Sequence, residues 1–297
     1  MTPAGALSAA GRIQRQPPVI LAFGGFDPTG GAGVLRDAVA IHAAGGYAAA
    51  VPSCLAIQTT ASFERIVPLP RAALDGALSC AAESFPIRAV KIGMVGTRAA
   101  AEAIHNFLVQ LPNVPVVLDP VLRSSSGAPL LAQGALPAYR KLFGRASVLT
   151  PNLPEIEKIL DRKVKVFGEA ILAARDLALA TGASVVLKGG HFPWKGKRGV
   201  DIVFEDGRVT LIGPGGKAPP VDTHGTGCAL ASALTARLTL GEPLVQAAQE
   251  AKALLARWIT GGFPSAEGRW TLFAPGEPAG SRSVHGRAER RRPGRKI

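Results

Sequence analysis

The stretch Val19-Ile20-Leu21-Ala22-Phe23-Gly24-Gly25 leads, one residue later, into Asp27-Pro28-Thr29-Gly30-Gly31-Ala32-Gly33. An apolar run that ends in glycine and is followed by a glycine-rich turn is typical of a buried strand that enters a loop and then a helix. The glycine spacing matches neither the Walker pattern nor Gly-x-Gly-x-x-Gly. On its own the loop is therefore as consistent with a tight strand-to-helix turn as with a ligand-binding loop.

The same alternation of strand and helix patterns continues along the chain. Further strands are predicted at 47–57, 89–94, 114–118, 147–149 and 185–187. Helices are predicted at 32–44, 71–84, 98–111, 133–143, 154–160, 169–181, 228–240 and 243–260. Segments 199–205 and 208–212, joined by Asp206-Gly207, predict a hairpin. Buried strands alternating with helices indicate an α/β fold, a doubly wound and mainly parallel sheet with helices on both faces.

Polar residues and glycines gather where the predicted strands end. They are Gly24, Gly25, Asp27, Gln58, Gly93, Asp119, Asn152, Lys188 and Gly189. Ligands of doubly wound sheets bind beyond the carboxyl ends of the strands, so the pattern predicts a single cleft. Some members have a plain structural interpretation as well, since Asp119 can start a turn and Asn152 with Glu155 can cap a helix. Lys188 favours a ligand role, because a lysine at a buried strand end needs an anionic partner.

A second informative stretch is Val221-Asp222-Thr223-His224-Gly225-Thr226-Gly227-Cys228, which precedes a small, apolar run at 229–240. Gly225 and Gly227 permit a tight turn that brings N–H groups close to a ligand, and the run behind them predicts a helix. A helix N-terminus offers unpaired N–H donors and the positive end of a dipole. The arrangement therefore suits a phosphate group.

Cys228 falls in the first turn of that predicted helix. The same field favours a thiolate, and a group placed there could take a proton from an attacking hydroxyl. Free cysteines usually just pack in cores, but the position after Gly225-Thr226-Gly227 favours a functional role. His224 has two interpretations, contact with a phosphate or a hydrogen bond to the backbone. Taken alone, these residues indicate phosphoryl transfer to an alcohol.

Length and composition favour one domain. With 297 residues, of which 47% are apolar, the chain can bury a large core as a single α/β unit. No apolar run approaches the roughly 18 residues needed to span a bilayer, and residues 1–16 lack a cleavable leader pattern, so we expect a cytosolic protein. Cys54, Cys80 and Cys228 are widely spaced without a metal-ligand pattern. We expect reduced thiols, two of them in the core.

The formal net charge of +13 is unevenly distributed. Segment 281–297 carries seven Arg or Lys residues against one Glu, so much of the excess lies in a tail. The remainder of the chain has few aromatic residues and no nucleic-acid recognition module, which argues against nucleic acid as a partner. A charged segment with proline and glycine buries too little apolar surface to become ordered.

Seven short motifs, taken in their order along the chain, carry a specific resemblance to a known family. They are residues 24–33, Gln58, Val90-Lys91-Ile92-Gly93-Met94, Leu118-Asp119-Pro120-Val121, Leu149-Thr150-Pro151-Asn152-Leu153-Pro154-Glu155, Leu187-Lys188-Gly189-Gly190-His191 and 222–228. In this order they resemble the hydroxymethylpyrimidine/phosphomethylpyrimidine kinases of thiamine biosynthesis, a ribokinase-like family. The resemblance covers about residues 18–262. It implies a kinase domain at 17–275, between an N-terminal extension at 1–16 and a basic tail at 276–297, both expected to be disordered.

The resemblance implies an enzyme that uses ATP and Mg²⁺. Such an enzyme phosphorylates 4-amino-5-hydroxymethyl-2-methylpyrimidine and then the resulting monophosphate. Its partners are these small molecules and no membrane, and a homodimer stays open. Gln58 resembles the residue that hydrogen-bonds the aminopyrimidine, and Gly25, Asp27, Gly33 and Met94 resemble the lining of the same pocket.

The resemblance also implies roles at the transfer centre. Gly225, Thr226 and Gly227 resemble an anion hole for the transferring phosphate, and Cys228 stands where most sugar kinases of the superfamily carry an aspartate base. The nucleotide side is implied to consist of Lys188, Asn152 and Asp222 for ATP, and of Asp119 and Glu155 for Mg²⁺, partly through water.

Some residues depart from the family pattern. Phe26 stands where a serine is usual and Thr59 where an asparagine is usual, and Arg36 and Val39 also differ. Because Phe26 and Thr59 are expected near the pyrimidine, they put acceptor specificity in question more than the chemistry. The alternatives are a pyridoxal-type kinase, which shares the fold and the hydroxymethyl acceptor chemistry, and a non-catalytic sensor that retains the pyrimidine pocket. A third alternative is nucleic-acid binding through the basic tail.

Overall fold

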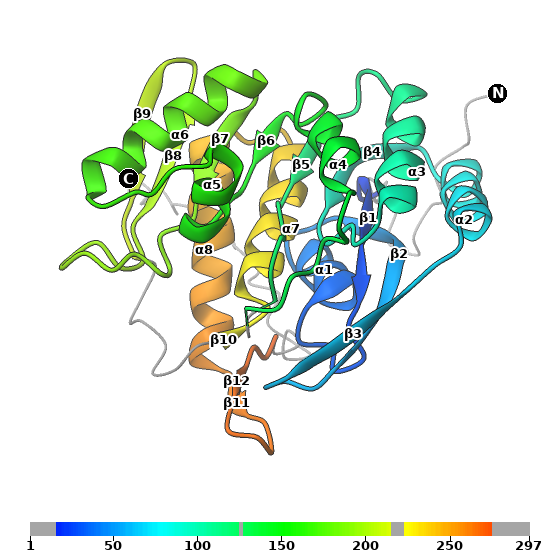
Figure 1. Cartoon of the computed structure of the whole chain (residues 1–297), viewed down its shortest axis with the longest axis horizontal. Helices are drawn as coiled ribbons and strands as arrows, with labels where there is room; N and C mark the ends of the chain where they lie inside the picture. Colours follow the sequence, from blue (N-terminus) through cyan, green and yellow to red (C-terminus); the bar gives the residue numbers. More distant parts are fainter. Residues whose placement is uncertain (1–15, 125–126, 215–222, 275–297) are drawn as a thin grey trace, which may run out of the picture.

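A nine-stranded sheet runs through the molecule in the order β3-β2-β1-β4-β5-β6-β7-β8-β9 (Figure 1). The computed structural model describes residues 16–124, 127–214 and 223–274. The strands are β1 (Val19–Phe26), β2 (Tyr47–Gln58), β3 (Phe63–Pro68), β4 (Ile87–Ile92), β5 (Val116–Leu118), β6 (Val148–Leu149), β7 (Ser184–Leu187), β8 (Asp201–Glu205) and β9 (Arg208–Ile212). Neighbouring strands from β2 to β7 are parallel, whereas β3, β8 and β9 are antiparallel to their neighbours at the two edges.

Helices cover both faces of this sheet. One layer contains α2 (Arg71–Ser84), α3 (Arg98–Val109), α4 (Leu136–Phe143), α5 (Leu153–Leu160) and α6 (Phe167–Thr181). The opposite layer contains α1 (Gly33–Ala43), α7 (Thr226–Thr239) and α8 (Leu244–Thr260). A smaller sheet of β10 (Thr223–His224), β12 (Trp270–Thr271) and β11 (Phe263–Pro264) lies below the large one in Figure 1.

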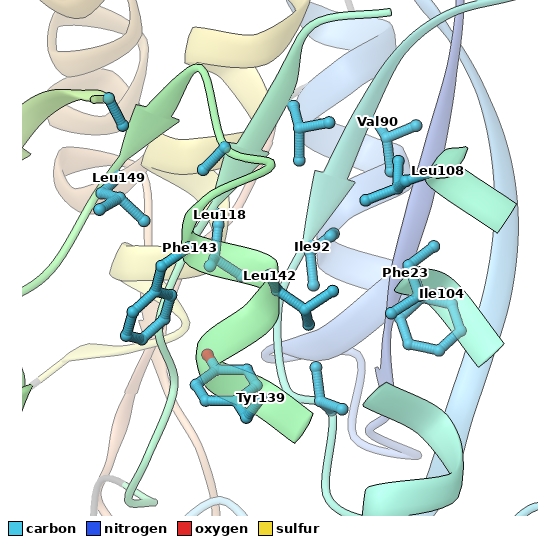
Figure 2. Close-up of a cluster of buried hydrophobic side chains, with 14 of the residues drawn as sticks. Phe23, Val90, Ile92, Ile104, Leu108, Leu118, Tyr139, Leu142, Phe143 and Leu149 are labelled. Atoms are coloured by element: carbon cyan, nitrogen blue, oxygen red, sulfur yellow. The ribbon is translucent and has the colours of Figure 1, made fainter. Parts of the chain in front are cut away.

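The alternation of side chains along β1 shows why this strand is central. Leu21 and Phe23 point into the core shared with α2 to α6, whereas Ile20 and Ala22 point into the core shared with α1, α7 and α8. Side chains of a strand alternate between the two faces, so a strand covered on both faces must be apolar at every position. Figure 2 shows the first core, where Phe23 lies opposite side chains of α3 and α4.

The chain order creates a switch point beside β1. β1 and β4 are neighbours in the sheet. The connection after β1 leads to β2 on one side, whereas the connection after β4 leads to β5 on the other side, so the two connections run in opposite directions along the sheet. In open α/β sheets such a point opens a crevice beyond the carboxyl ends of the strands. The predicted doubly wound fold with helices on both faces is confirmed, and it places the glycine-rich loop after β1 at the carboxyl edge of the sheet, beside the switch point.

Several elements differ from the predictions. The helix expected from 133 begins at Leu136, because Gly134 adopts a φ of +80° and the turn of residues 132–135 precedes the helix. β3 and the three short strands of the small sheet were not anticipated. Of the three cysteines Cys54 is buried, Cys228 is half-buried and Cys80 is exposed, so the expectation of two core cysteines is wrong. The segments expected to be disordered, 1–16 and 276–297, lie outside the described residues except for residue 16.

No helix in the described part of the chain combines the length and the apolar character needed to cross a membrane.

Candidate active site

Polar residues that follow the parallel strands lie together at the carboxyl edge of the sheet. Asp119 follows β5, and its carboxylate accepts a hydrogen bond from the Thr150 hydroxyl at 3.1 Å. Asn152 after β6 and Lys188 after β7 are joined by a backbone bridge, and the Lys188 N–H donates to the Pro151 carbonyl. The parallel strands therefore bring together residues that are far apart in sequence.

Asp27 organises the loop after β1. Its carboxylate accepts hydrogen bonds from the Thr29 N–H at 2.9 Å, the Thr29 hydroxyl at 2.8 Å and the Ala32 N–H at 2.9 Å. His224 Nε2 lies 2.9 Å from Asp27 Oδ2. Burial would raise the pKa of Asp27, but hydrogen bonds from His224, Gln58 and Thr29 outweigh that effect and hold it well below its usual range. Asp27 is thus an ionised carboxylate, with His224 and Gln58 both bound to it.

The expected pocket residues lie close together around this loop. The Met94 methyl group packs onto Gly25, where a Cβ atom would come within 2.1 Å of it. Gly33 has a φ of +63°, and a Cβ atom there would lie 2.1 Å from the Gly25 carbonyl oxygen. Only glycine allows this closure without displacing backbone. Gly25, Asp27, Gly33, Gln58 and Met94 therefore form one wall of the candidate site.

The turn before α7 packs against the same loop. Gly225 is the N-cap of α7 with a φ of +79°, and a Cβ atom on it would lie 1.8 Å from the Gly31 carbonyl oxygen. Gly227 faces the other side of the site, since a Cβ atom there would lie 3.1 Å from Lys188 Nζ and 3.7 Å from Asp119 Oδ2. The turn of residues 225–227 therefore lies between the loop after β1 and the charged strand ends.

The Cys228 thiol lies at this same junction, in the first turn of α7. The N–H of Gly33, the first residue of α1, donates to the Cys228 sulfur, so the thiol lies near the beginnings of two helices. Burial nevertheless raises the pKa of Cys228 to about 11, and the nearby carboxylates of Asp37 and Asp119 act in the same direction, against the opposing effect of Lys91. The helix start does favour a thiolate, as expected, since the Gly33 N–H acts to lower the pKa, but burial outweighs this effect. Desolvation of the charged form dominates here.

Lys188 forms a compact charged cluster with two carboxylates. Its Nζ atom lies 2.5 Å from Asp119 Oδ1 and 3.9 Å from Glu155 Oε2. Burial disfavours the charge on Lys188, but Asp119 and Glu155 outweigh burial and raise the pKa of Lys188. Burial also raises the pKa of Glu155 to about 7, although Lys188 opposes this shift. In this structure the anionic partner that Lys188 needs is Asp119.

Asn152 and Glu155 form the N-terminal capping box of α5. The Asn152 side-chain oxygen accepts from the Glu155 N–H at 2.9 Å, and the Glu155 carboxylate accepts from the Asn152 N–H at 2.7 Å. The helix-cap interpretation of these two residues is thus present in the structure. It also orients Glu155 toward Lys188, so capping and a place in the charged cluster are compatible.

A buried ion pair beneath the site was missed by the sequence analysis. Lys91 on β4 and Asp37 on α1 are both fully buried, with Nζ and Oδ1 2.7 Å apart. Ser232, one turn after Cys228 on α7, donates its hydroxyl to the same Asp37 oxygen at 2.8 Å. The signal was available, because Lys91 interrupts an apolar strand pattern and the argument used for Lys188 applies equally to it.

The predicted site residues that the structure describes form two groups, and the turn of residues 225–228 lies between these groups. One group surrounds Asp27 and Gln58, and the other surrounds Lys188 and Asp119. Asp222, which was assigned to the nucleotide, lies outside the described residues. A ligand on the first group and a phosphate-bearing ligand on the second would meet at the N-terminus of α7, where backbone N–H groups suit a phosphate.

Comparison with known proteins agrees with this arrangement. The sequence model of a family described as phosphomethylpyrimidine kinase matches residues 27–272. A hydroxymethylpyrimidine/phosphomethylpyrimidine kinase of Aquifex aeolicus is 33% identical over 79% of this chain and 91% of its own length. The crystal structure of a phosphomethylpyrimidine kinase from Clostridium difficile superimposes with a TM-score of 0.70 at 28% identity, over 81% of this chain and 98% of that one.

A longer relative carries a region similar to this chain. The thiamine biosynthesis multifunctional protein ThiED of Corynebacterium efficiens is 37% identical over 84% of this chain. The matched region is 33% of that relative, so the chain spans about a third of its length.

Proposed function

Since this chain belongs to the phosphomethylpyrimidine kinase family, we propose that it transfers a phosphoryl group from ATP to 4-amino-5-hydroxymethyl-2-methylpyrimidine and then to the resulting monophosphate. One observation carries the proposal. The glycine turn before α7 lies between the wall around Gln58 and the cluster around Lys188, within reach of both. Transfer between two ligands requires such an arrangement, because phosphoryl transfer depends mainly on positioning and on neutralising phosphate charge.

The acceptor belongs on the wall formed by Gln58, Asp27 and Met94. A side-chain amide both donates and accepts hydrogen bonds, so Gln58 matches the amino group and ring nitrogen of an aminopyrimidine. The Met94 side chain offers an adaptable apolar surface to the ring. Asp27 holds Gln58 and the loop after β1 in place, which is a positioning role.

The nucleotide phosphates belong beside Lys188 and the turn of residues 225–227. The Lys188 ammonium is a mobile donor that can leave Asp119 for a phosphate oxygen. Gly227 keeps backbone close to this ammonium, and no side chain intervenes. The first N–H groups of α7 provide the remaining donors.

Asp119 and Glu155 fit a Mg²⁺ ion that is bound together with a nucleotide. No group of three or more histidine, cysteine, aspartate or glutamate side chains is placed to hold a metal within the described residues. Mg²⁺ often binds through one or two carboxylates together with water and substrate phosphates, so two carboxylates suit it. Asp119 and Glu155 would hold the ion beside the nucleotide, where its charge would neutralise negative charge on the phosphates.

In this proposal Cys228, in the first turn of α7, is the group that takes the proton of the acceptor hydroxyl. Its raised pKa makes the thiolate a strong base but leaves very little of it ionised at pH 7. A contribution to the first transfer is therefore expected to be modest. The second acceptor is a phosphate, which carries charge at neutral pH and needs no base, so the second transfer is expected to be independent of the thiol.

A coupled assay of ADP formation tests the proposal. The pyrimidine and its monophosphate should each raise the rate of ADP formation above the rate without acceptor. When the pyrimidine and pyridoxal are supplied together and compete, pyridoxal should be phosphorylated far less than the pyrimidine. Preferred turnover of pyridoxal would favour the pyridoxal-type kinase instead. Calorimetric binding of the pyrimidine with no phosphorylation of any acceptor would favour a sensor.

A further inference from the structure

Glu267 connects two segments that are more than 200 residues apart in sequence. Its carboxylate accepts hydrogen bonds from the Thr59 hydroxyl at 2.8 Å, the Thr60 hydroxyl at 2.8 Å and the Ala61 N–H at 3.0 Å. The Thr60 and Ser265 hydroxyl oxygens also lie 2.7 Å apart. Hydrogen bonds from Thr60 and Thr59 hold the pKa of Glu267 below its usual range. Both oxygens of this exposed carboxylate are therefore engaged by one loop.

The contacted loop begins directly after the acceptor residue Gln58. The strand register shifts between Ile57 and Gln58, so Gln58 lies at an irregular end of β2. The Thr59 N–H donates to the Ser62 carbonyl at 2.8 Å and closes the loop. Nothing in this short connection is buried deeply, and exposed loops of this kind open at low free-energy cost. Asp27 hydrogen-bonds the Gln58 side chain, and what holds the loop decides the backbone position from which that side chain starts.

The other side of the contact leads to the transfer centre. Glu267 lies in the turn between β11 and β12, which is closed by the Ser265 N–H donating to the Arg269 carbonyl at 2.7 Å. β12 pairs with β10, and β10 leads directly into Gly225. One short sheet therefore runs from the loop after Gln58 to the turn that is proposed to hold the phosphate.

We propose that Glu267 is a positioning residue for the acceptor: its carboxylate holds residues 59–61 against the β11–β12 turn and thereby fixes Gln58 for binding of the pyrimidine. The identity of the acceptor rests on the function proposed above. Hydrogen bonds to an ionised carboxylate are stronger than those between neutral groups, and an amide in its place would present N–H donors to a loop that itself offers donors. Thr59, where the family usually has asparagine, is one of the donors.

The test compares Glu267→Gln with the wild-type protein and with Glu64→Gln. Glu64 is an exposed carboxylate on β3 that pairs with Arg65, so it controls for loss of a surface charge nearby. Hydrogen exchange of the Ala61 amide reports the contact, and calorimetry reports the dissociation constant of the pyrimidine. Steady-state kinetics reports kcat and the KM of ATP.

For Glu267→Gln we expect faster exchange at Ala61 and a pyrimidine dissociation constant raised about three- to tenfold, as for the loss of one or two charge-assisted hydrogen bonds at an exposed site. The kcat and the KM of ATP should stay within about twofold, and Thr60→Val should shift the dissociation constant in the same direction. Faster exchange with an unchanged dissociation constant would overturn the proposal, because the contact would then be structural alone. Unchanged exchange would overturn the contact itself.

The two proposals fail separately. Exchange and pyrimidine binding need no turnover, so an inactive wild-type protein that still binds the pyrimidine would contradict the proposed kinase and leave the comparison of Glu267→Gln intact. A wild-type protein that does not bind the pyrimidine contradicts both the acceptor assignment and the role of Glu267 that rests on it.

Discussion

Cys228 lies near the N-termini of both α7 and α1, yet its pKa is raised and not lowered. A helix N-terminus stabilises a thiolate only when the charged form is also solvated or paired. Here burial has the largest effect, and the carboxylates of Asp37 and Asp119 reinforce it. Lys91 and the Gly33 N–H oppose them without prevailing. A sequence pattern can place a thiol at a helix start, but it does not show which charges fold against it.

The raised pKa of Cys228 predicts a distinct pH dependence of its alkylation. Reaction with iodoacetamide requires the thiolate, so in a Cys80→Ser background the rate at Cys228 should rise about tenfold per pH unit from pH 7 to pH 10. Mass spectrometry of the modified peptide measures this rate. A plateau that begins near pH 9 would show an ordinary thiol and contradict the assignment. The exposed Cys80 in the unsubstituted protein is a positive control for labelling.

The same residue should affect the two transfers unequally. Cys228→Ala should lower kcat for the pyrimidine alcohol by about tenfold, which is less than the roughly 100-fold or larger effect of a typical general base because little thiolate is present at pH 7, and should change kcat for the monophosphate by less than about threefold. In the wild-type protein the first transfer should also rise with pH above 7, whereas the Ala variant should lack this rise. Rates are measured with each acceptor separately at saturating ATP. Equal losses in both transfers would rule out a base role and indicate a general effect on the turn of residues 225–227.

The ion pair of Lys91 and Asp37 predicts opposite outcomes for single and double substitutions. Asp37→Leu leaves the Lys91 ammonium buried without its partner, which costs roughly 3–5 kcal/mol of the free energy of unfolding. Asp37→Leu with Lys91→Met replaces the pair by apolar side chains of similar volume and should recover most of that loss. Urea unfolding with constant m-values measures both. A single variant as stable as the wild-type protein would show that the pair is not ionised.

At the scale of elements, the N-terminus of α5 allows the capping role of Asn152 to be tested separately from its proposed contact with the nucleotide. The capping box predicts that Asn152→Ala lowers the free energy of unfolding by about 1 kcal/mol, because it removes the acceptor for the Glu155 N–H. Asn152→Ser keeps a capping oxygen and should retain nearly all of that stability. If Asn152 also contacts the nucleotide, as proposed, both variants should weaken ADP binding about three- to tenfold in calorimetry. An Asn152→Ser variant that binds ADP like the wild-type protein would reduce the role of this residue to capping.

Helices and strands with a clear hydrophobic pattern of their own were predictable from the sequence. Strands that form only because a distant strand pairs with them were not. β1 is apolar along its length because both faces are buried, and α2 was predicted with the bounds that the structure shows. By contrast, β3 contains Glu64-Arg65 and ends in Pro68, so its pattern is that of a polar loop until β2 pairs with it. The two-residue strands of the small sheet exist only through their partners, which lie more than 40 residues apart for β10 and β12. Local periodicity contains no information about such pairs.

At the scale of the whole molecule, the predicted residues come together because parallel strands end at one edge, a consequence of the fold class. The partners of each residue were not predictable in the same way. Lys188 binds Asp119 across 69 positions, and His224 binds Asp27 across 197. Glu267 carried no signal in the sequence analysis, since it lies in a turn without a motif and after residues 18–262, where the resemblance was recognised, although the family model extends to residue 272. The position of the site follows from topology, whereas its electrostatics follow from packing.

Truncation of the basic tail tests where the catalytic unit ends. Leu272 is buried, and its carbonyl accepts a hydrogen bond from the Arg36 guanidinium at 3.1 Å, so a chain that stops after Gly276 keeps this contact. The truncated chain loses the seven basic residues of the tail and two acidic residues, Glu277 and Glu289. Its kcat/KM for the pyrimidine should therefore stay within about twofold of the full chain, because neutral acceptors gain little from long-range charge.

The same truncation tests the tail as a nucleic-acid contact. The full chain should bind duplex DNA weakly at 50 mM salt and lose that binding near 200 mM, because the salt dependence of the binding constant is set by the number of phosphates that the protein neutralises. The truncated chain should bind less DNA at both salt concentrations. A large loss of kinase activity on truncation would place the tail inside the catalytic unit, and equal DNA binding by both chains would place the basic surface in the folded part of the protein.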